Sequence, residues 1–115
     1  MHPKSPKWCE DIVQRCADIE DWTTNSTLTG YETSSMLRSA VERNFEVIGE
    51  VLLRLERTDP ATATRITDYR KIIGFRNRLA HGYDDVDNQQ VSDIVANFLP
   101  VLRADVEAFL TEIES

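Results

Sequence analysis

Four side chains that can act on a phosphate group lie close together in the stretch GFRNRLAHGYDD, residues 74–85. They are Arg76, Asn77, His81 and Tyr83. Histidine exchanges a proton near neutral pH, arginine binds phosphate through a planar fork of donors, and a tyrosine ring can stack on a base. This combination suits cleavage of an RNA phosphodiester without a metal ion. A base would activate the ribose 2′-hydroxyl group while a cation stabilises the phosphate.

Spacing decides which of these side chains can meet. Arg76 and His81 are five residues apart, about 140° around a regular helix, so they do not share a face. Asn77 and His81 are four apart and do share one. We expect Gly82 to end the helix and to turn His81 and Tyr83 toward the same open end. The alternative is structural, because a histidine or an Arg-Asn pair at a helix C-terminus can serve only as a cap.

One histidine in this motif would have to serve as both acid and base. The other histidine, His2, lies near the N-terminus. A symmetric homodimer would place two copies of Arg76 and His81 across one cleft. We therefore expect a composite site, with an inactive monomer.

The chain has 115 residues, of which 41% are hydrophobic and 29% charged, which fits one globular domain over residues 1–115. No apolar run approaches the ~18–20 residues of a membrane span. The start, MHPKSPKWCEDIV, lacks the apolar stretch of a secretory signal. These features predict a protein with no membrane partner.

The net charge of −7 argues against general, charge-driven binding to nucleic acid. The charge is unevenly spread, however. Residues 65–78 carry +4 and the remainder −11, and the basic segment includes Arg78 next to Arg76 and Asn77. It is either a solvated helix face or a local anion-binding patch. Because the segment leads directly into the motif, we favour the second interpretation.

Cys9 and Cys16 are seven residues apart, or about 10 Å along a helix, which is too far for a disulfide. We expect them to be buried thiols in a reducing, cytoplasmic compartment. Cys9, Cys16, His2 and His81 lack the paired spacing of a zinc site. We expect the protein to need no metal or other cofactor.

Apolar periodicity predicts four main helices and no strands. The first spans about residues 6–22, with Ser5 as N-cap, and a Thr- and Ser-rich loop follows over residues 23–30. The second spans about 31–55. A turn or short helical piece begins at Asp59-Pro60, the third helix runs from Thr67 or Asp68 to His81, and the fourth starts at Asp87 and kinks at Pro100. The expected fold is an all-α, antiparallel four-helix bundle.

Two residues of the second helix are unusual for their positions, and two further residues show how far the apolar stripes extend. Asn44 lies in the apolar stripe of the second helix and needs hydrogen-bond partners, for which we favour a core contact over a site role. Gly49 lies mid-helix, where close packing would explain it. The stripe of the second helix is thickened by Met36, and that of the fourth extends to Ile113.

The stretch RNRLAHGY resembles the R-x4-H-x-Y signature of HepT-type toxins in the HEPN superfamily. AVERNFEVIGEVLLRL (residues 40–55) is similar to the long second helix of that family, and GYDDVDNQQV and FLPVL also match its pattern. The similarity covers nearly all of the chain from the second helix onward. R-x4-H alone is a loose pattern, whereas the ordered set is fairly specific.

The resemblance implies an all-α protein that dimerises so that its motifs meet in a cleft, and a metal-independent ribonuclease. It implies that Arg76 and His81 are catalytic, with Asn77 as the polar residue after the arginine. Tyr83 matches the tyrosine to which a cognate MNT-type nucleotidyltransferase antitoxin adds AMP. An acidic residue of the second helix, Glu46 or Glu50, would support the site, and Arg78 is a further supporting candidate.

The function predicted from these residues is an RNA-cleaving toxin of a toxin–antitoxin pair, acting on tRNA or mRNA as a homodimer or a higher assembly. The alternative is a non-catalytic helical subunit that binds a nucleotidyltransferase, in which Arg76 and His81 bind a nucleotide phosphate. A purely structural dimerising bundle is a third interpretation, but it leaves the basic segment before His81 unexplained.

Overall fold

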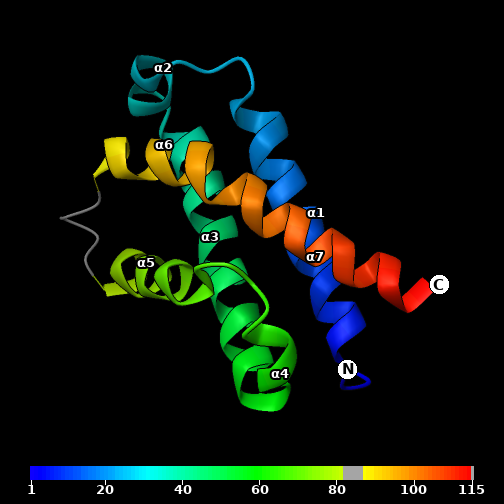
Figure 1. Ribbon diagram of the computed structural model, residues 1–115. Helices are drawn as coiled ribbons and strands as arrows, with labels where there is room; N and C mark the ends of the chain where they lie inside the picture. The colour runs from blue at the N-terminus through cyan, green and yellow to red at the C-terminus, as the bar shows by residue number, and fades with distance from the viewer. Residues whose placement is uncertain (82–86, 115) are drawn as a thin grey trace.

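The protein was studied as a computed structural model, which describes residues 1–81 and 87–114 and, among these, every side chain except those of residues 80, 81 and 114. The described residues form helices and no strands (Figure 1). The all-α prediction is therefore confirmed. The helices are α1 (Ser5–Thr23), α2 (Leu28–Thr33), α3 (Ser35–Thr58), α4 (Pro60–Ala63), α5 (Tyr69–His81), α6 (Asn88–Asn97) and α7 (Leu99–Glu114).

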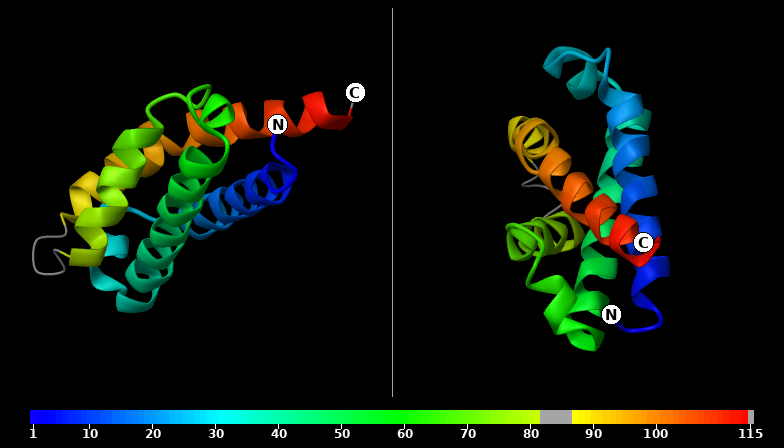
Figure 2. Two further views of the ribbon diagram at one scale, coloured as in Figure 1. Left: turned by 90° about the horizontal axis from the view of Figure 1, so that it is seen from below. Right: turned by 45° about the vertical axis from the view of Figure 1, so that its right-hand side comes forward.

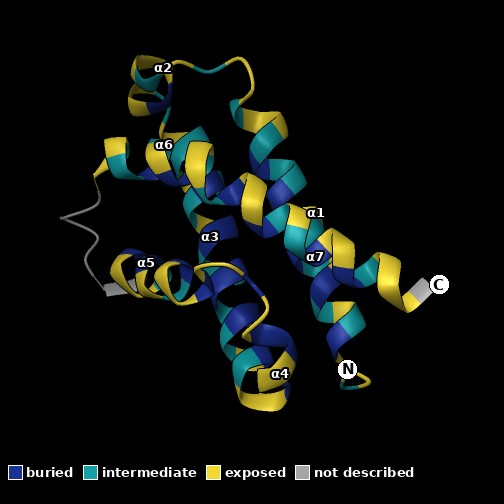
Figure 3. Ribbon diagram, in the orientation of Figure 1, coloured by how far each residue is buried: buried dark blue, intermediate teal, exposed yellow. Residues whose placement is uncertain are grey.

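Helix α3 is the centre of the bundle. It packs against α1 on one side and α5 on the other, while α7 packs on α1 (Figure 2). Helices α1 and α3 run in opposite directions (Figure 1). The buried positions of each helix face the interior (Figure 3). Phe45 of α3 and Phe75 of α5 meet edge to face, with ring centroids 5.3 Å apart. None of the described helices is long and apolar enough to cross a membrane.

Helix α1 begins one residue earlier than predicted, and Ser5 is not its N-cap. Lys4 occupies that position without a side-chain hydrogen bond. The Ser5 hydroxyl instead donates to the Asp59 carboxylate at 2.8 Å, and the backbone N–H of His2 donates to the same carboxylate at 3.0 Å. Burial would raise the pKa of Asp59, but hydrogen bonds from His2, Thr62 and Ser5 outweigh it and hold that pKa well below its usual range. The prediction failed because a distant carboxylate captured the hydroxyl.

The predicted loop at residues 23–30 is wrong in its second half, where α2 begins at Leu28. Thr27 caps this helix by accepting a hydrogen bond from Gly30 N–H at 3.0 Å. Ser34 then leaves helical geometry and caps α3 by accepting from Leu37 N–H at 3.2 Å. The sequence predicted one helix beginning at about residue 31. The structure has two helices here, because Thr27 caps the start of α2 and Ser34 caps the start of α3. As a consequence Met36 lies in the first turn of α3, 83% exposed, and not in the core.

The boundaries of α4 and α5 follow the predicted signals closely. Asp59 caps α4 by accepting from Thr62 N–H at 3.3 Å. Helix α5 starts at Tyr69, one residue after Asp68, which has a φ of 55°. Aspartate tolerates this left-handed conformation better than most residues. Helix α5 ends at His81 as predicted, whereas the predicted role of Gly82 lies outside the described residues.

The C-terminal region bends between α6 and α7, as the predicted kink requires. Asp87 caps α6 by accepting from Gln89 N–H at 2.9 Å. At the bend, Phe98 N–H still donates to the Ile94 carbonyl group at 2.9 Å, so the chain continues in helical geometry ahead of Pro100. The predicted stripe stops short of the end, because Ile113 is 46% exposed.

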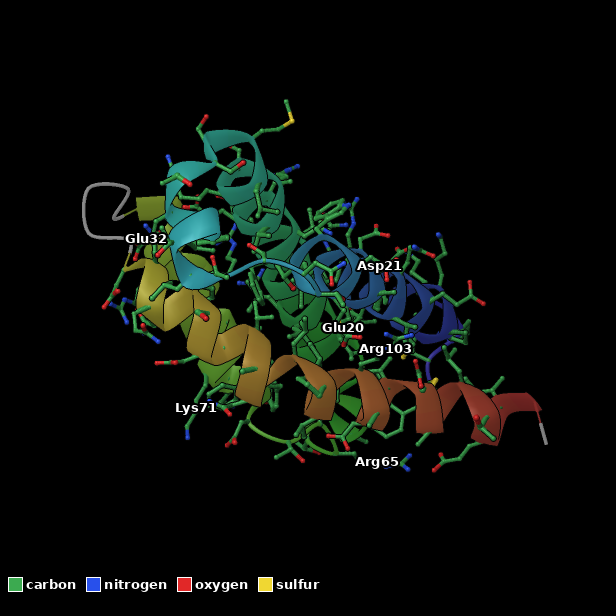
Figure 4. The ribbon with its side chains drawn as sticks, turned by 90° about the horizontal axis from the view of Figure 1, so that it is seen from above. Glu20, Asp21, Glu32, Arg65, Lys71 and Arg103 are labelled. Atoms are coloured by element: carbon green, nitrogen blue, oxygen red, sulfur yellow. The ribbon has the colours of Figure 1, made fainter. Side chains whose placement is uncertain are left out.

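A contact between α7 and α1 completes the bundle. Arg103 of α7 donates to Glu20 of α1 at 2.6 Å and to Glu107 at 2.7 Å, and Figure 4 shows Arg103 and Glu20 facing each other between these helices. Cys9 and Cys16 are both free and buried, as predicted. Burial raises the pKa of Cys9 to about 11 and that of Cys16 to about 12, so both are inert thiols at neutral pH.

Candidate active site

Arg76 lies where α5 crosses α3 most closely. A Cβ atom built on Gly49 of α3 would lie 2.3 Å from Arg76 Cβ and 2.5 Å from Arg76 Cγ. No real pair of carbon atoms can approach so closely without a shift. Gly49 therefore has no side chain because the stem of Arg76 occupies that space, which confirms the close packing predicted for this glycine.

The Arg76 guanidinium group is held by two neighbours. Its Nη2 donates to Glu50 Oε2 at 2.9 Å, and its Nη1 donates to Asn77 Oδ1 at 3.0 Å. Its Nε is buried and has no hydrogen-bond partner among the described residues. The side chain is 26% exposed, so the fork is oriented and still reachable from solvent.

The two acidic candidates of α3 differ in what they contact. Glu50 binds Arg76 and also lies 3.6 Å from Arg54. Glu46, one turn earlier, pairs with Arg43 at 3.4 Å instead. Glu50 is therefore the carboxylate that orients Arg76, and Glu46 lies farther along the same groove.

Of the remaining predicted site residues, one contacts Arg76, one lies elsewhere and two fall at least partly outside the described part. Arg78 faces a different hollow, between α5 and the α6–α7 arm, which Lys71 also lines. Asn77 accepts from Arg76, as described above. The backbone of His81 ends α5, but its side chain and the whole of Tyr83 fall outside the described residues.

The basic segment that precedes the motif is largely paired within the molecule. Arg65 lies 2.6 Å from Glu112, Arg70 lies 3.4 Å from Glu56, and Lys71 lies 3.7 Å from Asp68. Together with the Arg76–Glu50 pair, these contacts engage most of its cations. The local excess of positive charge in the sequence therefore overstates what this segment offers to an anion.

A groove of about 510 Å³ opens beside Arg76, between α1 and α3. Besides Arg76, Glu46 and Glu50, it is lined by three side chains of α1 that the sequence did not connect with the motif, Trp8, Asp11 and Arg15. Trp8 is partly buried and packs against the core. No group of three or more metal-ligating side chains comes together in the described part of the chain.

The contact between Asn44 and Arg15 explains why an asparagine stands in the apolar stripe of α3. The amide is 2% exposed, and its Oδ1 accepts from Arg15 Nη1 at 2.9 Å while its Nδ2 donates to the Arg15 carbonyl group at 3.3 Å. The predicted core hydrogen bond of Asn44 is thereby confirmed. The sequence showed that this amide needed partners, but periodicity could not identify a residue 29 positions away as that partner.

Comparison with known proteins identifies the family of the chain. The family model described as "Ribonuclease HepT-like" matches residues 12–109, which is most of the chain. The protein belongs to this HepT-like family, of the HEPN superfamily, as the motif had implied. No solved structure matches the chain significantly.

Several curated proteins are similar over almost their whole length. One from Methanocaldococcus jannaschii, named as a putative RNase, is 28% identical over 104 residues, which are 90% of this chain and 85% of that protein. A second from the same organism, with the same kind of name, is 28% identical over 97 residues, 84% and 88% of the two chains. One from Caldanaerobacter subterraneus, also named as a putative RNase, is 23% identical over 108 residues, 93% and 96% of the chains.

The Gly49 contact predicts opposite effects for two glycine substitutions. Gly49→Ala forces α3 and Arg76 apart, and we expect it to lower the free energy of unfolding by about 1–3 kcal/mol. Gly74→Ala on α5 is the matched control, because an added Cβ there meets nothing within 4 Å. It should stabilise the helix by up to about 1 kcal/mol. Urea unfolding measures both, and equal stability of Gly49→Ala and the wild type would contradict the packing argument.

Proposed function

We propose that this protein is a metal-independent RNA endonuclease in which Arg76 and His81 act on the scissile phosphodiester. The observation that carries the proposal is the oriented guanidinium group of Arg76, which Glu50 and Asn77 hold at the edge of a groove. His81 follows five residues later, at the end of the same helix. Membership of the HepT-like family and the relatives named as RNases support the assignment to ribonucleases.

The chemistry proposed is an intramolecular transesterification. The imidazole of one His81 takes the proton from a ribose 2′-hydroxyl group, whose oxygen attacks the adjacent phosphorus. The bond from phosphorus to the 5′-oxygen breaks, and that oxygen receives a proton from a second imidazole. Arg76 stabilises the extra negative charge on the phosphoryl oxygens in the transition state. The products are a 2′,3′-cyclic phosphate and a 5′-hydroxyl group.

The second imidazole comes, in this proposal, from a second copy of the chain. His2 is poorly suited to the task, because its Nδ1 accepts the Lys4 N–H at 3.0 Å and its ring stacks parallel to Trp8. A two-fold symmetric homodimer supplies a second His81 and a second Arg76 to the same cleft. The site is then composite, and the separated subunit has no activity.

Cleavage tests the catalytic assignment directly. We expect His81→Ala to lower the rate of RNA cleavage in EDTA by at least about 100-fold, because a general acid–base group is lost. Arg76→Lys should also lose activity, since lysine keeps the charge and lacks the fork. Arg57→Gln, an exposed arginine of α3 outside the groove, is the control.

Wild-type RNA fragments should end in 2′,3′-cyclic phosphate, and circular dichroism should show unchanged helix content in all variants. Equal cleavage by the wild type and His81→Ala would refute the catalytic role of this residue. If no such ends form with any RNA tested, the alternative is favoured, in which the protein is a non-catalytic partner subunit of a nucleotidyltransferase.

We further propose that the nuclease is the toxin of a toxin–antitoxin pair and that a cognate MNT-type nucleotidyltransferase neutralises it by adding AMP to Tyr83. Tyr83 lies two residues after His81 in the sequence. An added AMP group there places a bulky anion beside the two proposed catalytic residues. It would compete with RNA phosphate for Arg76.

Intact mass tests this control. Protein produced together with the nucleotidyltransferase should gain mass in units of AMP, and peptide mapping should place the gain on Tyr83, with loss of RNA cleavage. Tyr83→Phe is the control, because it should keep cleavage and resist inactivation. A modified protein that still cleaves RNA at the wild-type rate would contradict the proposed neutralisation.

A further inference from the structure

The groove beside Arg76 extends well beyond the proposed catalytic residues. Arg15 and Trp8 line it from α1, and Arg43 and Arg54 line it from α3. It therefore joins Arg76 to a second set of side chains that the cleavage chemistry does not use. An aromatic ring and several guanidinium groups in one groove are the combination that binds single-stranded nucleic acid.

The charge of the groove is unlike that of the whole chain. Its lining holds four arginines and three carboxylates, whereas the chain carries a net charge of −7. All three carboxylates are paired: Asp11 with Lys7 at 2.8 Å, Glu46 with Arg43 at 3.4 Å, and Glu50 with Arg76. Among the described residues Arg15 has no carboxylate partner. It is therefore the arginine of the groove whose charge no carboxylate neutralises in this part of the chain.

Arg15 is also held in place before any ligand arrives. Its Nη1 donates to the buried Oδ1 of Asn44 at 2.9 Å. That bond uses one of the five N–H donors of a guanidinium group, and its direction fixes the plane of the others. A neutral amide orients the arginine without cancelling its charge. Little conformational entropy is then lost when a phosphate binds.

We propose that this groove binds the RNA nucleotide next to the scissile phosphate, with Arg15 binding the phosphate of that nucleotide and the base stacking on Trp8 in place of the His2 ring. The proposal rests on the ribonuclease function proposed above. RNA fits better than an acidic protein segment, because the groove offers an indole ring beside the guanidinium groups. Arg15 and Trp8 are thus binding residues that position the strand over Arg76.

Fluorescence can follow this binding separately from cleavage. The chain has two tryptophans, Trp8 and Trp22, so Trp22→Phe leaves Trp8 as the only reporter. The probe is a short, mixed-sequence, single-stranded RNA with 2′-O-methyl groups, which cannot form a cyclic phosphate. In this background we would measure the affinity at several salt concentrations for the parent, Arg15→Gln, Trp8→Leu and the control Arg57→Gln. Thermal melts and the oligomeric state of each variant would be recorded.

We expect the probe to quench Trp8, and Arg15→Gln to bind about tenfold more weakly, the usual loss for a hydrogen bond to a charged group. The slope of log K against log salt should fall by about 0.7, which corresponds to one phosphate contact on a single strand. Trp8→Leu should lose about tenfold in affinity through lost stacking. Arg57→Gln should keep the affinity and the slope of the parent.

The possible failures are distinct. If the parent cleaves RNA and binds the probe, but Arg15→Gln matches it in affinity and slope, the groove proposal is wrong and the ribonuclease proposal stands. If Arg15→Gln or Trp8→Leu separates the subunits without a change in affinity, the groove is an interface between copies and the proposal is again wrong. If the parent neither binds the probe nor cleaves RNA, both proposals are overturned.

Discussion

The close approach of α3 and α5 at Gly49 is the constraint on which the rest of the site depends. A side chain at this position would overlap the stem of Arg76, so only glycine allows the crossing seen. Because the next residue along α3 is Glu50, the same contact presents a carboxylate to the Arg76 guanidinium group. Packing places the arginine, and the hydrogen bonds to Glu50 and Asn77 set its orientation. The glycine costs up to about 1 kcal/mol of helix stability, and the site gains a fixed cation.

The contacts of the guanidinium groups have different consequences for binding an anion. Arg76 and Glu50 are 26% and 43% exposed, and a pair this close to solvent contributes at most about 1 kcal/mol. In the proposed site, an RNA phosphate would compete with Glu50 at modest cost, while the packing against Gly49 keeps the arginine in place. Arg15 is held differently, by the buried amide of Asn44, so no carboxylate has to be displaced. In the proposed site, Arg76 would exchange Glu50 for a phosphate, whereas Arg15 has no carboxylate partner to exchange among the described residues.

Much of this arrangement was predictable from the sequence, for identifiable reasons. Helical periodicity predicted the stripes of α1, α3 and α6–α7, and the position of Gly49 indicated close packing. The division of α2 from α3 was missed, because the polar caps at Thr27 and Ser34 lie within residues that were predicted as a loop and a helix start. The role of Ser5 was missed because its partner, Asp59, is 54 residues away. The groove was missed for the same reason: Arg15, Asn44 and Arg76 come from three helices, and periodicity carries no information on which helices are neighbours.

In the proposed mechanism, two copies of the chain build one cleft and each contributes a His81. The most direct measurement mixes wild-type and His81→Ala subunits under conditions of exchange, confirms mixed dimers by native mass spectrometry, and follows RNA cleavage at constant total protein. If both histidines are required, activity falls as the square of the wild-type fraction, because only dimers with two intact subunits cleave. Activity proportional to the wild-type fraction would show that each subunit acts alone, and it would contradict the composite cleft.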